Sequence, residues 1–286
     1  MKFVPRPIKG NVNVPEVSAG KEFLRLIAEI LGVLLIIYIV LGLAVDLIAP
    51  RISIQTEKKI GKLFAAKYDD KKYPKTREEI QQVLSGLVKN ASLPKFDYSA
   101  HIEDSAQVNA MALPAGNIVV YSALLKQVRS KNELAMVLAH ELGHFAHRDH
   151  LRGLGRGLIF LALSSVTLGT DSGVSKFLAS TLSSVEMRFS QAQERGADIY
   201  AVELLYKTYG DAAGATDFYE KMAAKEKISR VFYFFASHPY IKDRIAVING
   251  VIREKGYPVG EKIAIEFPEL AKSLAADNPA GTCGKE

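Results

Sequence analysis

The chain has 286 residues, of which 48% are hydrophobic and 24% charged, which is enough for one sizeable globular domain with additional segments. Its single cysteine, Cys283, excludes an intramolecular disulfide and a zinc site built from several cysteines. The net charge of +6 comes from Lys and Arg residues scattered along the chain. Because no nucleic-acid-binding module is recognisable, we expect the basic surface to face solvent or anionic lipid rather than nucleic acid.

The N-terminal region predicts a membrane anchor. Residues 1–22 contain several Pro and Gly residues and are expected to form a disordered tail. Residues 23–49 follow as an apolar stretch whose charge-free core, residues 30–45, is slightly short for a bilayer at ~1.5 Å per residue. Charged residues that can sit at the two interfaces lengthen the span: Arg25, Glu29 and Asp46. We therefore predict one transmembrane helix.

The basic residues on either side of this helix predict its orientation. The positive-inside rule favours a cytoplasmic N-terminus, and the remainder of the chain then lies outside the cytoplasm. Lys2, Arg6, Lys9, Lys21 and Arg25 precede the apolar stretch, and Arg51, Lys58, Lys59 and Lys62 follow it.

Residues 50–265 are predicted to form the globular domain, and residues 266–286 a C-terminal tail. Residues 51–92 have helical spacing of apolar side chains, interrupted at Tyr73-Pro74. The segment from Phe96 to Tyr121 is rich in residues that favour β-strands and is interrupted by a turn signal at 114–117. It predicts two or three antiparallel strands, with 108–113 and 118–121 on the two sides of that turn.

The second half of the chain is predicted to be helical. Residues 151–185 contain an apolar run, 157–169, that is short for a full membrane span, so a buried or membrane-surface helical hairpin is expected. Further helices are predicted at 185–209, ended by Gly210, at 211–229 and at 241–254.

The motif His140-Glu141-Leu142-Gly143-His144 lies on a predicted amphipathic helix. Two histidines four residues apart lie on one helical face, at the spacing that holds one Zn²⁺ between two ring nitrogens. The glutamate between them can accept a proton from a water molecule at the metal. Two core histidines and a surface glutamate are the alternative. A capping-box pair supports the start of this helix: Ser130 and Glu133.

A catalytic zinc site needs a third protein ligand, and two candidates remain. His150 has the spacing of the third metzincin histidine, but His147 stands where that pattern has the glycine that bends the chain. Glu194 and Asp198 are four residues apart on the later helix, so both carboxylates share a face. One of these carboxylates can bind the metal while the other accepts the second N–H of a ligand histidine. We favour Glu194 as the ligand.

Two further matches join these motifs, within residues 54–252: Asn109-Ala110-x-Ala112-x-Pro114, and Ser237-His238-Pro239 with Arg244. Together they resemble the membrane-associated zinc peptidases grouped with HtpX, the type-one CAAX prenyl protease and the mitochondrial overlapping-activity peptidase. Ala115-Gly116 replaces the double glycine usual in that family. The resemblance implies a mainly helical α+β gluzincin domain with a small antiparallel sheet.

The resemblance also implies roles for single residues. One Zn²⁺ would be held by His140, His144 and Glu194, with Glu141 as the general base. His238 and Arg244 would donate to the tetrahedral oxyanion, and in some relatives a histidine at the place of His238 approaches the metal and suppresses activity. His147 would have a structural role or support a ligand. The strand containing Asn109, Ala110, Met111 and Ala112 would bind the extended substrate.

These observations predict a membrane-anchored zinc endopeptidase that cleaves unfolded or damaged membrane or envelope proteins. We expect it in the bacterial inner membrane, with the peptidase domain facing the periplasm. A catalytically silent chaperone or adaptor with the same fold is one alternative, although Glu141 argues against it. A CAAX-type processing protease is the other, although one membrane span fits it poorly.

Overall fold

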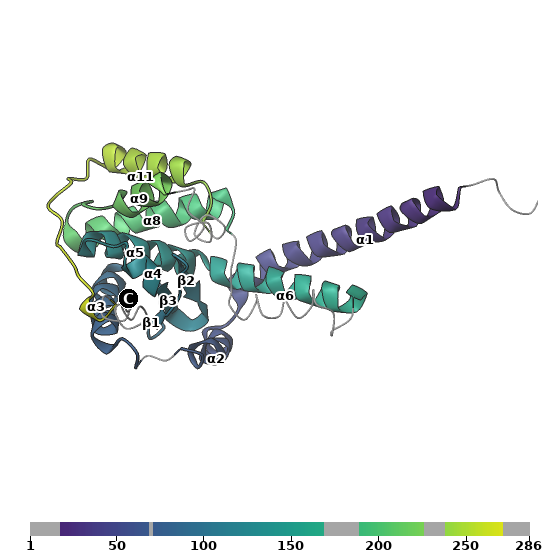
Figure 1. Cartoon of the computed structure of the whole chain (residues 1–286), viewed down its shortest axis with the longest axis horizontal. Coiled ribbons are helices and arrows are strands. Elements are labelled where there is room, and N and C mark those ends of the chain that lie inside the picture. Colours follow the sequence, from purple (N-terminus) through teal and green to yellow (C-terminus); the bar gives the residue numbers. More distant parts are fainter. Residues whose placement is uncertain (1–17, 69–70, 169–188, 226–237, 271–286) are drawn as a thin grey trace, which may run out of the picture.

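The computed structural model describes residues 18–68, 71–168, 189–225 and 238–270. These residues form a helical body around a small sheet, from which two helices extend on the same side (Figure 1). The predicted, mainly helical α+β class is confirmed. The helices are α1 (Ala19–Ile48), η1 (Ala49–Arg51), α2 (Ile54–Ala65), α3 (Pro74–Asn90), η2 (Pro114–Gly116), α4 (Ser122–Leu125), α5 (Lys131–His147), α6 (Asp149–Leu168), α8 (Gln191–Tyr209), α9 (Asp217–Ala224) and α11 (Ile241–Lys255).

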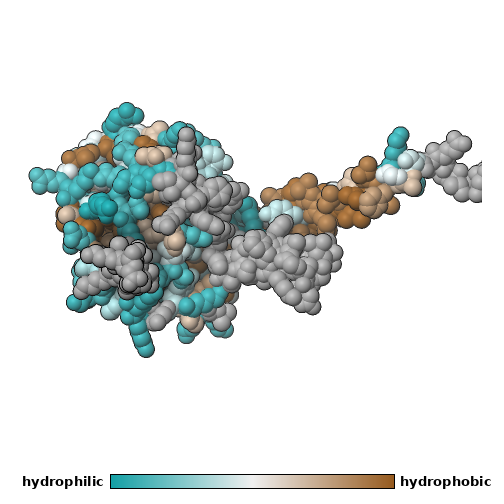
Figure 2. All heavy atoms as spheres, viewed as in Figure 1, coloured by the Kyte–Doolittle hydropathy of each residue, from teal (hydrophilic) through white to brown (hydrophobic). Residues whose placement is uncertain are grey.

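Helix α1 fits a membrane anchor. Among the described residues it is the one helix long and apolar enough to cross a membrane, and its apolar side chains are mostly exposed (Figure 2). The helix begins at Ala19, so residues 19–22 are helical rather than part of the expected tail. Residues 1–17, like residues 271–286, lie outside the described residues.

The sheet is mixed, whereas an antiparallel sheet was expected. Its strands are β1 (Ser99–Glu103), β2 (Ala110–Leu113) and β3 (Asn117–Tyr121), in the order β1-β3-β2. β2 and β3 form the predicted antiparallel pair around the turn, but β1 pairs with β3 in parallel. The reason is the position of β3 between the other two strands, which run in opposite directions. Among the described residues, β2 is consequently an edge strand.

Helix α5 is the centre of the body and is buried along most of its length. Ser130 caps its N-terminus, as predicted, since the hydroxyl oxygen accepts from Glu133 N at 3.2 Å. The Glu133 carboxylate accepts from Arg129 N instead of completing the box. Helix α8 crosses α5 closely: a Cβ on Gly143 would lie 2.8 Å from the Cα of Ala197. This contact sets the spacing of the two helices that carry the motifs.

The later elements differ in extent from the predictions. Helix α8 begins after Ser190, which forms a capping box with Gln193, and ends at Gly210 in the left-handed conformation, as predicted. Helix α9 is shorter than the predicted 211–229 and starts at Asp217. α11 closely matches its predicted range.

The C-terminal segment remains packed beyond residue 265. Phe267 and Leu270 are buried, and the Glu269 carboxylate accepts from the backbone and side chain of Thr76 at the start of α3. The expected tail therefore begins no earlier than the end of the described segment at Leu270.

A buried polar junction connects the anchor to the end of α5. Arg148 adopts the left-handed conformation, ends α5, and donates to the carbonyl oxygens of Ala49, Pro50 and Ile52, which follow α1. The buried Glu57 carboxylate of α2 lies 3.2 Å from the Arg148 guanidinium and 2.8 Å from His150 Nε2. Buried charges of this kind are stable only when paired.

Candidate metal centre

The two motif histidines face the same point, as their spacing on α5 requires. The Nε2 atoms of His140 and His144 lie 3.2 Å apart, and both side chains are buried. Two imidazole nitrogens at this separation on one helical face are placed to share one cation.

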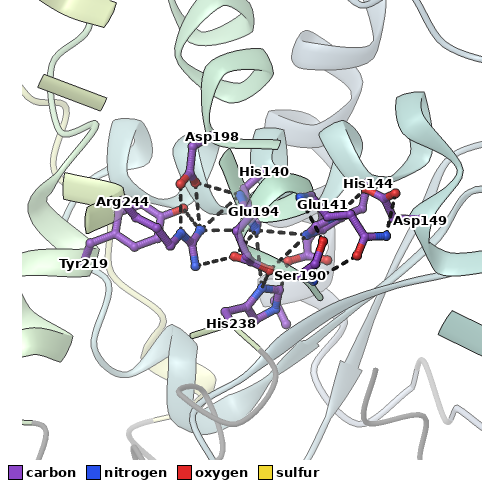
Figure 3. A network of polar contacts seen from close by, with 12 residues as sticks. His140, Glu141, His144, Asp149, Ser190, Glu194, Asp198, Tyr219, His238 and Arg244 are labelled. Carbon is purple, nitrogen blue, oxygen red and sulfur yellow. Dashed lines mark hydrogen bonds and ion pairs between the residues drawn. The ribbon is translucent and has the colours of Figure 1, made fainter. Parts of the chain in front are cut away.

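Two further groups approach the same point from α8 and from the residues before α11 (Figure 3). His238 Nδ1 lies 3.3 Å from His140 Nε2 and 3.1 Å from Glu194 Oε1. Glu194 Oε1 lies 3.7 Å from His144 Nε2. One ligand atom from each of these four buried residues lies within 4.8 Å of all the others.

These separations fit a zinc ion. A tetrahedron with metal–ligand bonds of ~2.0–2.2 Å has edges of ~3.3–3.6 Å, close to the distances between the four side chains. The Oε2 atom of Glu141 is buried without a hydrogen-bond partner in the described part of the chain. An unsatisfied buried carboxylate oxygen is unfavourable unless it meets a cation or a water molecule.

Glu141 is placed beside this point rather than in the ligand set. Its side chain is buried, and Oε1 lies 3.7 Å from His238 Nε2. The predicted general base therefore lies next to the cluster, and its Oε2 atom has no hydrogen-bond partner among the described residues.

Asp198 of α8 contacts the side of His140 that faces away from the cluster. Its Oδ1 lies 3.0 Å from His140 Nδ1, which leaves Nε2 of the same ring for the metal. Burial raises the pKa of Asp198, but Arg244 and His140 outweigh that effect and hold the pKa at about 2.

Arg244 lies behind the ligands, where it was not expected. Its Nε and Nη2 donate to the two oxygens of Asp198 at 2.9 and 2.8 Å, and Nη1 lies 2.7 Å from Glu194 Oε2. Nη2 also donates to the hydroxyl of Tyr219, whose ring stacks below the guanidinium. A guanidinium committed to two buried carboxylates positions them, so the expected donation to an oxyanion is not supported.

Asp149 takes the supporting role that was considered for His147. Its Oδ2 lies 3.1 Å from His144 Nδ1, and its Oδ1 accepts from Gln193 Nε2 at 2.8 Å. His147 is exposed and instead faces Tyr200 and Gly196 of α8. Sequence reasoning missed Asp149 because a left-handed, non-glycine residue at 148 has no reliable local signal.

Phe189 is a second residue that the sequence did not indicate. Its ring stacks on that of His144 with centroids 3.8 Å apart. His144 is thus held by a carboxylate on one edge and an aromatic ring on its face. Burial lowers the pKa of His144, but the bonds to Asp149 and Glu194 outweigh it and raise the pKa to about 9.

His150 is not part of the cluster. Its Nε2 bonds to Glu57, in the junction described above. The preference for Glu194 over His150 agrees with this geometry, but the reasoning was partly wrong, because α5 ends at Arg148 even without a glycine.

The strand considered for substrate binding lies at the sheet edge, and its residues are buried. Ala110 and Ala112 belong to the main core, while Met111 packs in a second cluster with Phe189. The side chains of the two alanines are therefore packed in the core. Asn109 accepts through its carbonyl oxygen from Tyr121 N, which continues the pairing with β3.

Comparison with known proteins agrees with this geometry. Residues 74–252, more than half of the chain, match peptidase family M48. The chain belongs to this family. This is a peptidase family, and the chain has a group of His and Glu side chains that could hold a metal ion.

Three relatives illustrate the similarity. The Beta-barrel assembly-enhancing protease of Yersinia pestis is 27% identical over 60% of this chain and 38% of its own length. The Mitochondrial metalloendopeptidase OMA1 of Schizosaccharomyces pombe is 26% identical over 69% of this chain and 61% of its own. The Metalloprotease LoiP of Escherichia coli is 29% identical over 59% of this chain and 70% of its own. The chain thus spans less than two thirds of the first two relatives.

Proposed function

We propose that the protein is a membrane-anchored zinc endopeptidase that cleaves unfolded or damaged membrane or envelope proteins. The observation that carries the proposal is the buried cluster of four ligand atoms within 4.8 Å, with the unpartnered oxygen of Glu141 beside it. One zinc ion per chain would be held by His140, His144 and Glu194. The bond between His150 and Glu57 favours this ligand set over the alternative metzincin arrangement.

The side chains have separate roles in this mechanism. Bound zinc would supply Lewis acidity, which polarises the peptide carbonyl and makes water more acidic. Glu141 accepts the proton of the attacking water and returns it to the leaving amine. Asp198 and Asp149 hold the rings of His140 and His144 by their Nδ1 atoms. Arg244 keeps the carboxylates of Glu194 and Asp198 ionised and in place.

His238 occupies the fourth corner of the cluster, where a catalytic site keeps an open position. We propose that its Nδ1 leaves this corner when substrate enters, after which the ring can donate to the oxyanion. A restrained resting state would suit a peptidase that tolerates many sequences.

The edge position of β2 supports extended and loosely specified substrates. In the described residues β2 pairs with β3 on one side only. Strand addition supplies backbone hydrogen bonds that are independent of side-chain identity. Residues Asn109, Ala110, Met111 and Ala112 would form this edge. The burial of their side chains leaves recognition to the backbone.

The location that we propose is the bacterial inner membrane, crossed once by α1, with the peptidase domain in the periplasm. The support is the charge distribution around α1 and the bacterial relatives with protease names. Polypeptides and the lipid bilayer are then the partners.

The test uses the full chain purified in detergent, with casein as an unfolded substrate. Glu141→Gln should retain one zinc per chain but lose casein cleavage by several orders of magnitude, because only the base is removed. Glu78→Gln on the exposed face of α3 is the matched control and should change neither property. Cleavage by the Glu141 variant, or a wild-type chain that binds no zinc, would refute the proposal.

A second variant tests His238. If the ring restrains the site, His238→Ala raises the initial rate on short peptides. If the ring acts only on the oxyanion, the same variant lowers kcat. A change in zinc content of His238→Ala reports how strongly Nδ1 holds the metal.

A further inference from the structure

Helix α6 leaves the metal centre and runs out beside the membrane anchor (Figure 1). Its first residue, Asp149, is the one that bonds to His144. Farther along, a Cβ on Gly155 would lie 2.8 Å from Cγ1 of Val45 in α1, so the glycine lets the two helices approach closely. α1 runs towards the body and α6 away from it, which makes the pair antiparallel.

Charged residues end at the same level on both helices. Asp46 of α1 lies 2.5 Å from Arg156 of α6 and 4.0 Å from Arg152. Beyond this cluster, away from the body, residues 30–45 of α1 and 157–168 of α6 contain no charged residue. When two helices pack together in water, nothing requires charged residues to stop at the same level on both. A hydrocarbon boundary imposes that change on every helix that crosses it.

The length of the uncharged part limits how deep α6 can reach. Residues 157–168 rise by ~18 Å at ~1.5 Å per residue, a little over half of a hydrocarbon core of ~30 Å. Leu158 at the start of this part is 53% exposed, and Ala162 one turn later is also exposed, so this face is not covered by the body.

We propose that α6 enters the bilayer beside α1 as a half-depth membrane helix, with lipid acyl chains covering its exposed apolar face. The proposal rests on the proposed anchoring by α1, with which the inserted surface is continuous. Asp46, Arg152 and Arg156 then lie at the headgroup level, where Arg side chains are stabilised. Because α6 starts at Asp149, which contacts His144 and lies seven residues before Arg156, the metal centre is held ~11 Å from that level along the helix.

The experiment places one fluorescent probe at a time in the full chain. Cys283→Ser removes the native thiol, and single cysteines carry an environment-sensitive nitrobenzoxadiazole label. The chain is reconstituted in vesicles of phosphatidylcholine and phosphatidylglycerol, with nitroxide groups at shallow or deep positions on the acyl chains. Casein cleavage by each labelled variant reports that it is folded.

Two α6 positions test the proposal, and two others calibrate it. Leu158→Cys and Ala162→Cys should show blue-shifted emission and quenching by the nitroxides, with Ala162→Cys favouring the deeper one. Leu35→Cys on the exposed face of α1 should also be quenched, whereas Lys58→Cys on exposed α2 should not.

Each pattern of quenching decides between the alternatives. If both α6 probes behave like Lys58→Cys while Leu35→Cys is quenched, the anchor stands and insertion of α6 is refuted. If Leu35→Cys is not quenched either, the anchoring by α1 fails and the α6 proposal fails with it. Stronger quenching of Leu158→Cys than of Ala162→Cys by the deep nitroxide would also refute the depth order.

Discussion

Gly143 offers a direct test of how the two motif helices determine the metal centre. A Cβ at this position would lie 2.8 Å from Cα, 3.0 Å from the carbonyl oxygen and 3.2 Å from Cβ of Ala197 on α8. Backbone atoms of a helix cannot rotate away as a side chain can. Gly143→Ala must therefore separate α5 and α8 by about 0.6 Å to restore an ordinary contact of 3.4 Å.

This displacement should affect metal binding more than folding. Overpacking costs ~1–3 kcal/mol, and the better helix propensity of alanine offsets ~1 kcal/mol of that loss. Glu194 is one turn before Ala197 and moves with α8, while His140 and His144 stay on α5. Because metal–ligand distances tolerate only ~0.2 Å, we expect a zinc affinity ~10–100-fold lower.

The assay is competition for zinc between the purified chain and a chromogenic chelator, with thermal unfolding of the zinc-free protein alongside. Gly86→Ala on α3 is the matched control, since a Cβ there meets nothing within 4 Å. It should raise stability by ~0.5–1 kcal/mol and leave zinc affinity unchanged. If Gly143→Ala binds zinc like the wild type and gains stability like the control, the close crossing does not control the site.

Three further predictions concern the groups around the ligands. Asp149→Asn should lower zinc affinity ~10–100-fold in the same chelator assay, because His144 loses the carboxylate that orients it. The control Asp97→Asn, in an exposed loop, should leave zinc affinity unchanged. If both variants bind zinc with equal affinity, Asp149 does not orient His144. Asp198 has a pKa of about 2 in place of 3.8, so it contributes on the order of 2 kcal/mol above pH 3.8 that is lost as the pH falls towards 2. Acid unfolding of the zinc-free chain should show this loss, and Asp198→Asn should not; parallel curves would contradict the pairing with Arg244. Glu57→Ala should lower the free energy of unfolding, measured by urea titration, by ~3–5 kcal/mol, because Arg148 loses its buried partner. If the effect is as small as that of Glu78→Ala at an exposed position, the junction between Glu57 and Arg148 does not stabilise the fold.

Features that depend on near neighbours in the chain were predictable. The spacing of His140 and His144 places both rings on one face in any helix, and Ser130 caps that helix through its own hydroxyl. The same holds for Glu194 and Asp198, whose four-residue spacing aligns their carboxylates. α1 follows from composition alone, because a long apolar stretch cannot be soluble unless it is buried or in lipid.

Other features required the tertiary structure because their partners are distant in the chain. The parallel pairing of β1 with β3 depends on which strands lie side by side in the sheet, and the periodicity of the sequence does not encode that order. The left-handed Arg148 is stabilised by carbonyl groups almost a hundred residues earlier, and only that turn brings Asp149 to His144. Arg244 was expected to face the substrate, yet burial between two carboxylates decided its position.

The sequence alone therefore determined the helical spacing of the candidate ligands and the apolar helix that fits an anchor, since these depend on local geometry and composition. The tertiary structure decided which groups support the ligands and how α6 lies against α1. Those arrangements are selected by the pairing of buried charges and by close packing between segments that the chain separates widely.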